Sequence, residues 1–157
     1  MAIRFNSAAR IIPISMLLLF AAASAMAQGS FGGKWVIVDS HIPDWAGSNS
    51  LQRTSATNSD VGVVVEFRSS EVVTDSKLAC ESAAYKVIRL NPAEVFNGRA
   101  GADTREASEA AGITSKSATL RVDCGNGRQL DYHEAGKATL VVLLGDSLYT
   151  LMREDQR

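Results

Sequence analysis

The three residue types of a hydrolytic triad stand side by side at Asp39, Ser40 and His41. On a β-strand, successive side chains point to opposite faces, so the Ser40 hydroxyl would point away from the His41 ring that should activate it. The fragment also lacks the G-x-S-x-G turn that presents a catalytic serine. We therefore predict no catalytic residue here, and we interpret His41 as a strand-end histidine bonded to Asp39 or Asp44.

The second histidine, His133, belongs to an acidic and aromatic run. Strand alternation puts Asp131 and His133 on one face and Tyr132 on the other, toward the core. If strand pairing brought His133 close to His41, the two rings could bind a metal ion together with Asp39 and Asp131. Nothing in the sequence requires that meeting. The prediction is a polar surface, without a metal ion or a cofactor.

Aromatic side chains give a stronger indication of binding. Trp45 stands where a first strand would give way to a polar loop rich in Ser, Asn and Thr, and Phe96 lies in a short helical turn. A large aromatic side chain at such a position can stack on a ligand or anchor a partner protein. Alternatively, Trp45 folds back as a lid over one end of the fold. The candidate binding residues are His41, Trp45, Phe96 and His133.

Other chemistry has less support in the residue pattern. The carboxylates are scattered and do not form the spaced pair that a glycosidase needs. The sequence Gly125-Asn126-Gly127 is typical of a hairpin turn and not of a phosphate-binding loop. A formal net charge of −1 provides no concentrated basic surface, so we expect no nucleic-acid partner.

The start of the chain reads as a secretory signal of the Sec type. Arg4 and Arg10 form a positively charged front before an apolar run over 11–23, and a small-x-small cleavage site ends at position 27. We expect residues 1–27 to be removed and residues 28–157 to fold as one domain in the periplasm or outside the cell. The remaining chain has no apolar run long enough for stable membrane insertion. The alternative is an uncleaved N-terminal anchor.

The two cysteines, Cys80 and Cys124, form a natural pair in such an oxidising compartment. Neither has a second ligand at a spacing typical of zinc sites, and no CxxC redox motif is present. We predict a structural disulfide. Two buried free thiols are the alternative.

The elements that must position these residues are mainly strands, because the dominant hydrophobic period is two. Short helices are indicated near 91–98 and 103–111 by capping residues. Eight short strands with tight turns suit a small antiparallel up-and-down barrel, and a two-layer sandwich is the alternative. The expected strands cover 33–40, 61–68, 71–74, 84–90, 119–124, 128–134, 138–144 and 148–153.

A family resemblance supports the barrel. Gly33-Lys34-Trp35 looks like the lipocalin Gly-x-Trp signature, and Arg153 stands where lipocalin-like barrels carry an arginine over that tryptophan. Stacked on indole, this arginine would close one end of the barrel by a cation–π contact. Most of the chain resembles small exported proteobacterial lipocalin-like proteins of unknown function, although the long polar loop after Trp45 departs from them. The further matching pieces are Trp35-Val36-Ile37-Val38, Pro43-Asp44-Trp45, Val63 to Phe67, Ala79-Cys80 before Tyr85, Pro92 to Gly98, Asp131-Tyr132-His133 and Leu148 to Leu151.

Together these patterns favour a non-enzymatic exported binding protein whose barrel holds a small apolar ligand. The alternative is a periplasmic inhibitor or immunity-type protein that acts on a cell-wall hydrolase such as lysozyme, using the loop after Trp45. An open barrel interior would favour the first hypothesis. A packed interior would move the function to the outside.

Overall fold

The computed structural model describes residues 29–46, 58–96 and 104–157 of the chain. The expected signal peptide (residues 1–27) and most of the polar loop after Trp45 lie outside this part. The helices are α2 (Thr104–Ala110) and the single 3-10 turns η1 (Gly29–Phe31), η3 (Asn58–Asp60), η4 (Pro92–Glu94) and η5 (Glu154–Gln156). The strands are β1 (Gly33–His41), β2 (Val64–Phe67), β3 (Val72–Val73), β4 (Ala84–Leu90), β5 (Ser117–Asp123), β6 (Gln129–Gly136), β7 (Thr139–Leu144) and β8 (Ser147–Arg153).

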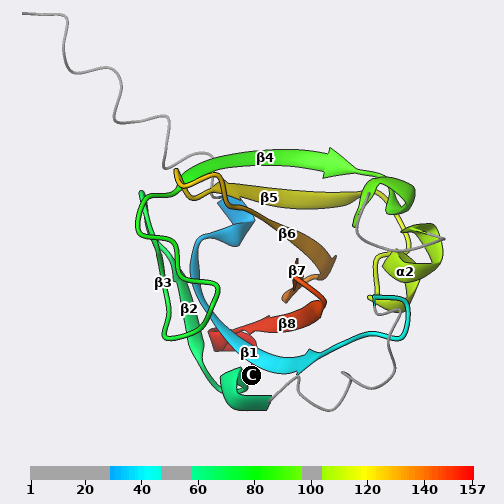
Figure 1. Cartoon of the computed structure of the whole chain (residues 1–157), viewed down its shortest axis with the longest axis horizontal. Coiled ribbons are helices and arrows are strands. Elements are labelled where there is room, and N and C mark those ends of the chain that lie inside the picture. Colours follow the sequence, from blue (N-terminus) through cyan, green and yellow to red (C-terminus); the bar gives the residue numbers. More distant parts are fainter. Residues whose placement is uncertain (1–28, 47–57, 97–103) are drawn as a thin grey trace, which may run out of the picture.

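All eight strands belong to one antiparallel sheet in the order β3-β2-β1-β8-β7-β6-β5-β4. Strands that follow each other in the chain are neighbours everywhere except at β3 and β4, and β8 returns to pair with β1. This is the topology of an up-and-down barrel, and twist curls the sheet accordingly. Figure 1 looks along the curl, with β2 and β3 on the left and α2 outside the sheet on the right. The predicted fold class is confirmed, and the alternative of a two-layer sandwich is excluded because the strands in the described part of the chain form one sheet.

The described residues do not form the fully closed barrel that the strand count suggested. Only two residues of β3 pair, and the chain then enters the 74–83 segment instead of running beside β4. The gap is bridged by two hydrogen bonds. The Ala83 N–H donates to the Ser70 carbonyl, and the Tyr85 hydroxyl donates to the Glu71 carbonyl, both at 2.7 Å. We call this bridged gap the seam.

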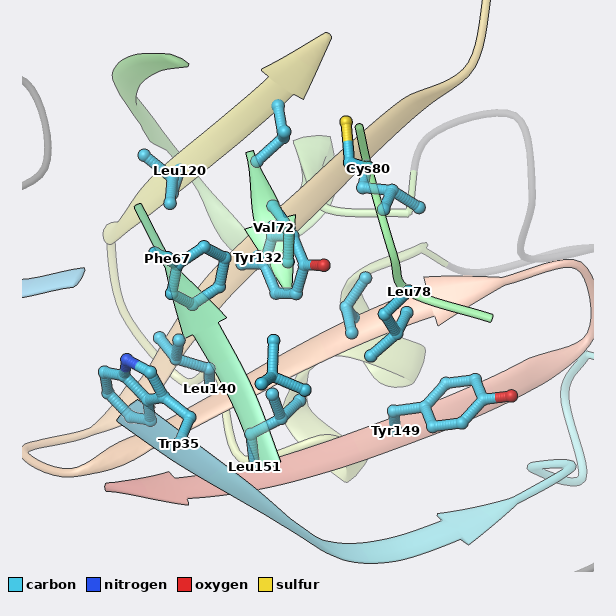
Figure 2. Close-up of a cluster of buried hydrophobic side chains, with 14 of the residues drawn as sticks. Trp35, Phe67, Val72, Leu78, Cys80, Leu120, Tyr132, Leu140, Tyr149 and Leu151 are labelled. Carbon is cyan, nitrogen blue, oxygen red and sulfur yellow. The ribbon is translucent and has the colours of Figure 1, made fainter. Parts of the chain in front are cut away.

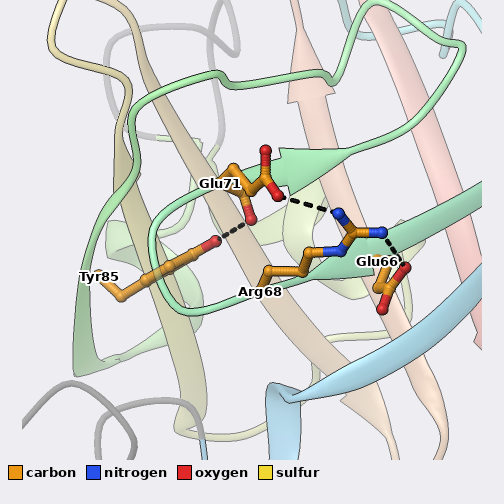
Figure 3. Close-up of polar contacts among 4 residues, drawn as sticks. All are labelled: Glu66, Arg68, Glu71 and Tyr85. Carbon is orange, nitrogen blue, oxygen red and sulfur yellow. Dashed lines mark hydrogen bonds and ion pairs between the residues drawn. The ribbon is translucent and has the colours of Figure 1, made fainter.

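Arg68 organises the hairpin that leads to the seam. Its guanidinium donates to Glu71 Oε1 at 3.0 Å and to Glu66 Oε2 at 3.1 Å, as Figure 3 shows. Its backbone N–H also donates to the Glu71 carbonyl at 3.0 Å. Burial, and secondarily the Glu71 carboxylate, raise the pKa of Tyr85 to about 12, so its hydroxyl remains a donor at neutral pH. The hairpin and β4 are thus joined through Glu71.

Seventeen buried side chains fill the space inside the curl, and each is at most 6% exposed. At the centre, the rings of Phe67 and Tyr132 meet edge to face with their centroids 4.9 Å apart (Figure 2). An eight-stranded barrel is only wide enough for its own side chains unless the residues that point inward are small. Here they are mostly large: Phe31, Trp35, Ile37, Val65, Phe67, Val72, Leu78, Cys80, Leu120, Val122, Cys124, Leu130, Tyr132, Leu140, Val142, Tyr149 and Leu151.

A second apolar cluster lies on the outer side of the sheet. On β7, Leu140 and Val142 point into the interior, whereas Val141 and Leu143 point outward and pack under the segment that contains η4 and α2. Strand β7 is therefore buried on both faces. The outer cluster consists of Val95, Phe96, Ala107, Ile113, Val141, Leu143 and Leu148, with Trp45, Leu90, Ala111 and Ala135 at its edge.

Two local features depart from simple alternation. Val61 lies in the expected strand 61–68 but is 43% exposed, because β2 begins only at Val64, after Gly62 adopts a left-handed φ of 91°. On β1, the pairing register with β8 shifts between Ile37 and Asp39, which marks a bulge. The bulge moves Asp39 to the outer face, where an uninterrupted strand would have put it inside.

Candidate functional site

The Trp35 and Arg153 side chains meet at one end of the curl. They are register partners on β1 and β8, and the guanidinium carbon lies 4.7 Å from the centre of the indole ring. The indole N–H donates to the Phe31 carbonyl at 2.9 Å, and the guanidinium donates to the carbonyls of Gly32 (3.3 Å) and Ser30. The contact implied by the lipocalin resemblance is therefore present. It fastens the η1 turn across the barrel end.

The predicted disulfide between Cys80 and Cys124 is confirmed, with Cα atoms 5.4 Å apart. It joins the 74–83 segment beside the seam to the end of β5. The Arg128 guanidinium reinforces this junction by donating to the carbonyls of Lys77 (3.2 Å) and Ala79. These contacts are structural and hold the edge of the sheet that no strand covers.

His41 ends β1 on the outer face, and its Nδ1 lies 2.6 Å from Asp39 Oδ2. The expected pairing with one of the two nearby aspartates is thus seen, with Asp39 as the partner. Both side chains are about half exposed. Within residues 29–46, 58–96 and 104–157, no three metal-ligating side chains form a group, so Asp39 and His41 do not combine with Asp131 and His133.

His133 differs from the polar surface residue that we expected, since it is only 3% exposed. Its side chain points to the outer face as predicted, but Phe96 folds over it, with ring centroids 5.4 Å apart. Nδ1 is hydrogen-bonded to the Thr119 hydroxyl at 2.8 Å. Burial lowers the pKa of His133 to about 4, so the ring is neutral at physiological pH.

Trp45, Phe96 and His133 form a row of three rings on the outer side. Trp45 stacks on Phe96 with centroids 5.1 Å apart and planes inclined by 27°. Trp45 therefore does fold back, but onto the outer cluster and not over an end of the barrel. Phe96 takes a left-handed backbone conformation (φ 53°), which costs a bulky residue of order 1–2 kcal/mol. Strain of this size persists where surrounding contacts enforce it.

The chain segment that carries Phe96 is fixed by its own capping contacts. The backbone N–H and side-chain amide of Asn91 donate to Glu94 Oε2 at 2.7 and 2.8 Å, which confirms the predicted helical turn. From α2, the Thr104 hydroxyl donates to the Ala93 carbonyl at 2.8 Å. The predicted helix at 103–111 is present as α2, although Asp103, its expected cap, lies outside the described residues.

An outer groove of about 630 Å³ opens beside Trp45. Its floor is the outer face of β7 and β8, and its walls are the end of β1 and the end of α2. Apolar, small and polar side chains line it together, and His41 is one of them. The lining residues are His41, Ile42, Pro43, Asp44, Trp45, Ala110, Ala111, Gly112, Ala135, Thr139, Val141, Leu148 and Thr150.

A smaller polar cavity of about 200 Å³ lies on the other side of Phe96. Its base is a two-pronged ion pair between Arg121 and Asp131, with N–O distances of 2.9 and 2.8 Å. This bond raises the pKa of Arg121 above its usual value. The lining residues are Leu90, Glu94, Phe96, Arg121, Gln129, Asp131, His133 and Leu143.

The structure thus joins three of the four candidate binding residues in one row and puts the fourth, His41, across the outer groove from α2. Sequence reasoning missed Arg121, Gln129 and Glu94. Alternation along the strands would have put Arg121 and Gln129 on the outer face, but it could not show that η4 lies over them.

No protein-family model, curated protein or solved structure matches this chain. Among the residues that the structure describes, no helix is long and apolar enough to cross a membrane.

Proposed function

We propose that this chain is a non-enzymatic exported binding protein that takes a small apolar ligand in its outer groove. The observation that carries the proposal is the contrast between the two sides of the sheet: the interior is filled by its own side chains, whereas the outer face has an open groove beside Trp45. The groove volume of about 630 Å³ lies within the range of roughly 300–1,000 Å³ typical of small-molecule sites.

The chemistry of the groove supports an apolar ligand with one polar end. Val141 and Leu148 form its floor, and the Trp45 ring offers a large flat surface. Polar side chains line it as well, namely Thr139 and Thr150 on β7 and β8, and His41 and Asp44 near the end of β1. Fixed polar groups beside an apolar wall are the usual design of a binding site for small molecules, and these could hydrogen-bond a ligand headgroup.

The proposal is tested by titrating the purified protein with the apolar dye Nile red and measuring its fluorescence. Trp45→Ala removes the aromatic wall, and we expect about tenfold weaker dye binding. Val64→Ala is the control, because Val64 is an exposed apolar residue on β2 that does not line the groove. Equal affinities of the two variants would contradict the groove as the site.

A protein partner is the second candidate, and the half-buried Trp45 beside an open groove favours it, because tryptophan is enriched among residues that dominate interface energies. The partner would be a cell-wall hydrolase such as lysozyme. Hydrolase assays with excess wild-type protein should then show inhibition that Trp45→Ala weakens. Full hydrolase activity in the presence of the wild-type protein would remove this candidate.

A further inference from the structure

The polar cavity is built by strand alternation on β5 and β6. Residues Leu120 and Tyr132 point into the barrel, so their neighbours along each strand point outward. Cross-strand pairing then places Arg121 opposite Asp131 and Thr119 opposite His133. The result is a patch of hydrogen-bonding groups on the outer face, walled by Phe96.

The charges within this cavity are largely balanced. Arg121 and Asp131 neutralise each other through two hydrogen bonds, and the Gln129 amide also donates to Asp131 at 3.3 Å. Glu94 is the remaining charged group, and one of its oxygens is occupied by the Asn91 cap. An anionic ligand would therefore meet an excess of negative charge. The cavity also offers no group of three metal-ligating side chains among the described residues.

Several polar atoms of the lining have no hydrogen-bond partner among the described residues. On His133, which is 97% buried, Nδ1 is bonded to Thr119 and Nε2 is left over. Arg121 Nη1 is a further donor, and Glu94 Oε1 and Gln129 Oε1 are acceptors. These groups face the cavity, so a bound molecule that supplies matching donors and acceptors can replace their hydrogen bonds to water.

We propose that the polar cavity is a second ligand site, which takes one neutral, hydroxyl-rich ring of monosaccharide size. Hydroxyl groups both donate and accept, which matches the mixture of donors and acceptors on Arg121, Glu94 and Gln129. The volume of about 200 Å³ is smaller than that of sites for drug-sized molecules and suits a single ring. Phe96 offers an apolar edge for the C–H groups of such a ring.

The two histidines of the chain make a direct test possible without any substitution. The purified wild-type protein is titrated with glucose, galactose and N-acetylglucosamine, and the imidazole nitrogen resonances are followed by NMR. We expect at least one of the sugars to shift the His133 resonances saturably and to leave those of His41, which lies outside the cavity, unchanged. A parallel titration with chito-oligosaccharides distinguishes a free sugar from the end of a glycan chain. No shift at His133 with any of these sugars, or equal shifts at both histidines, would overturn the proposal.

Two variants localise the site further. Gln129→Ala removes the amide, and Glu94→Gln removes a charge while keeping the oxygen that caps the η4 turn. Each should weaken sugar binding about tenfold. Glu81→Gln, at an exposed position outside the cavity, is the matched control and should bind like the wild type. Unchanged affinity in both cavity variants would contradict the assignment.

Discussion

Burial decides how the individual histidines of this protein behave. His41 is about half exposed and carries its own carboxylate partner, Asp39, at 2.6 Å. His133 is enclosed by Phe96 and bonded to a threonine hydroxyl that cannot compensate a positive charge. The sequence identifies both residues as polar side chains on strands. It does not show that the segment after η4, about 40 residues before His133 in the chain, covers only the His133 ring.

The buried His133 predicts a loss of stability in acid. Its pKa is about 4 in the folded state and near 6.5 in the unfolded state, so the unfolded chain takes up the proton first as the pH falls. Above pH 6.5 the ring is neutral in both states and imposes no penalty. Between 6.5 and about 4, the free energy of unfolding should fall by up to about 3 kcal/mol. Urea unfolding across this range measures the loss.

Because carboxylates also titrate in this range, a variant must isolate the contribution of the histidine. His133→Gln keeps a hydrogen-bonding group for Thr119 and cannot be protonated, so its stability should depend less steeply on pH. An identical slope in His133→Gln and the wild type would show that His133 is not buried as a neutral ring.

Among the elements, the strands were the easiest to predict and the edges of the sheet the hardest. Alternating apolar residues locate β4 to β8 to within a few residues, because each strand has one face in the core. The same rule fails at Val61, where Gly62 interrupts the strand, and at Asp39, where a bulge changes its face. The position of a bulge or of the seam depends on which strands pair and in which register, and the residues of one strand do not specify this.

The seam between β3 and β4 predicts a local effect of the disulfide. Val72 and Cys80 exchange two backbone hydrogen bonds (2.8 and 3.0 Å), and the Cys80–Cys124 bond holds this pair beside β5. Replacing both cysteines by serine should lower the free energy of unfolding by up to about 4 kcal/mol, given a separation of 44 residues. Hydrogen exchange should accelerate more at Val72 and Cys80 than at Val142 in β7. Uniform acceleration would contradict a local role.

For the molecule as a whole, the decisive feature is that different kinds of side chain pack against the inner and the outer face of the sheet. The inside is a packed apolar core, and the outside combines an apolar cluster, an open groove and a polar cavity around Phe96. The Trp35–Arg153 contact was foreseen from a family motif, and the cysteine pair was foreseen from the oxidising compartment expected for an exported chain. The row of Trp45, Phe96 and His133 was not, since it joins three distant segments and no periodicity reports such a meeting.

The central claim is that ligands bind to the outer face and not inside the barrel. Strand β7 provides its own control, because Val141 points outward to the groove while Leu140 and Val142 point inward. The most direct measurement is an NMR titration of carbon-labelled Leu and Val methyl groups with Nile red. The methyl resonances of Val141 and Leu148 should shift saturably, and those of Leu140 and Val142 should stay nearly unchanged. Larger shifts at the inward methyl groups would contradict the claim and would locate the ligand inside the barrel.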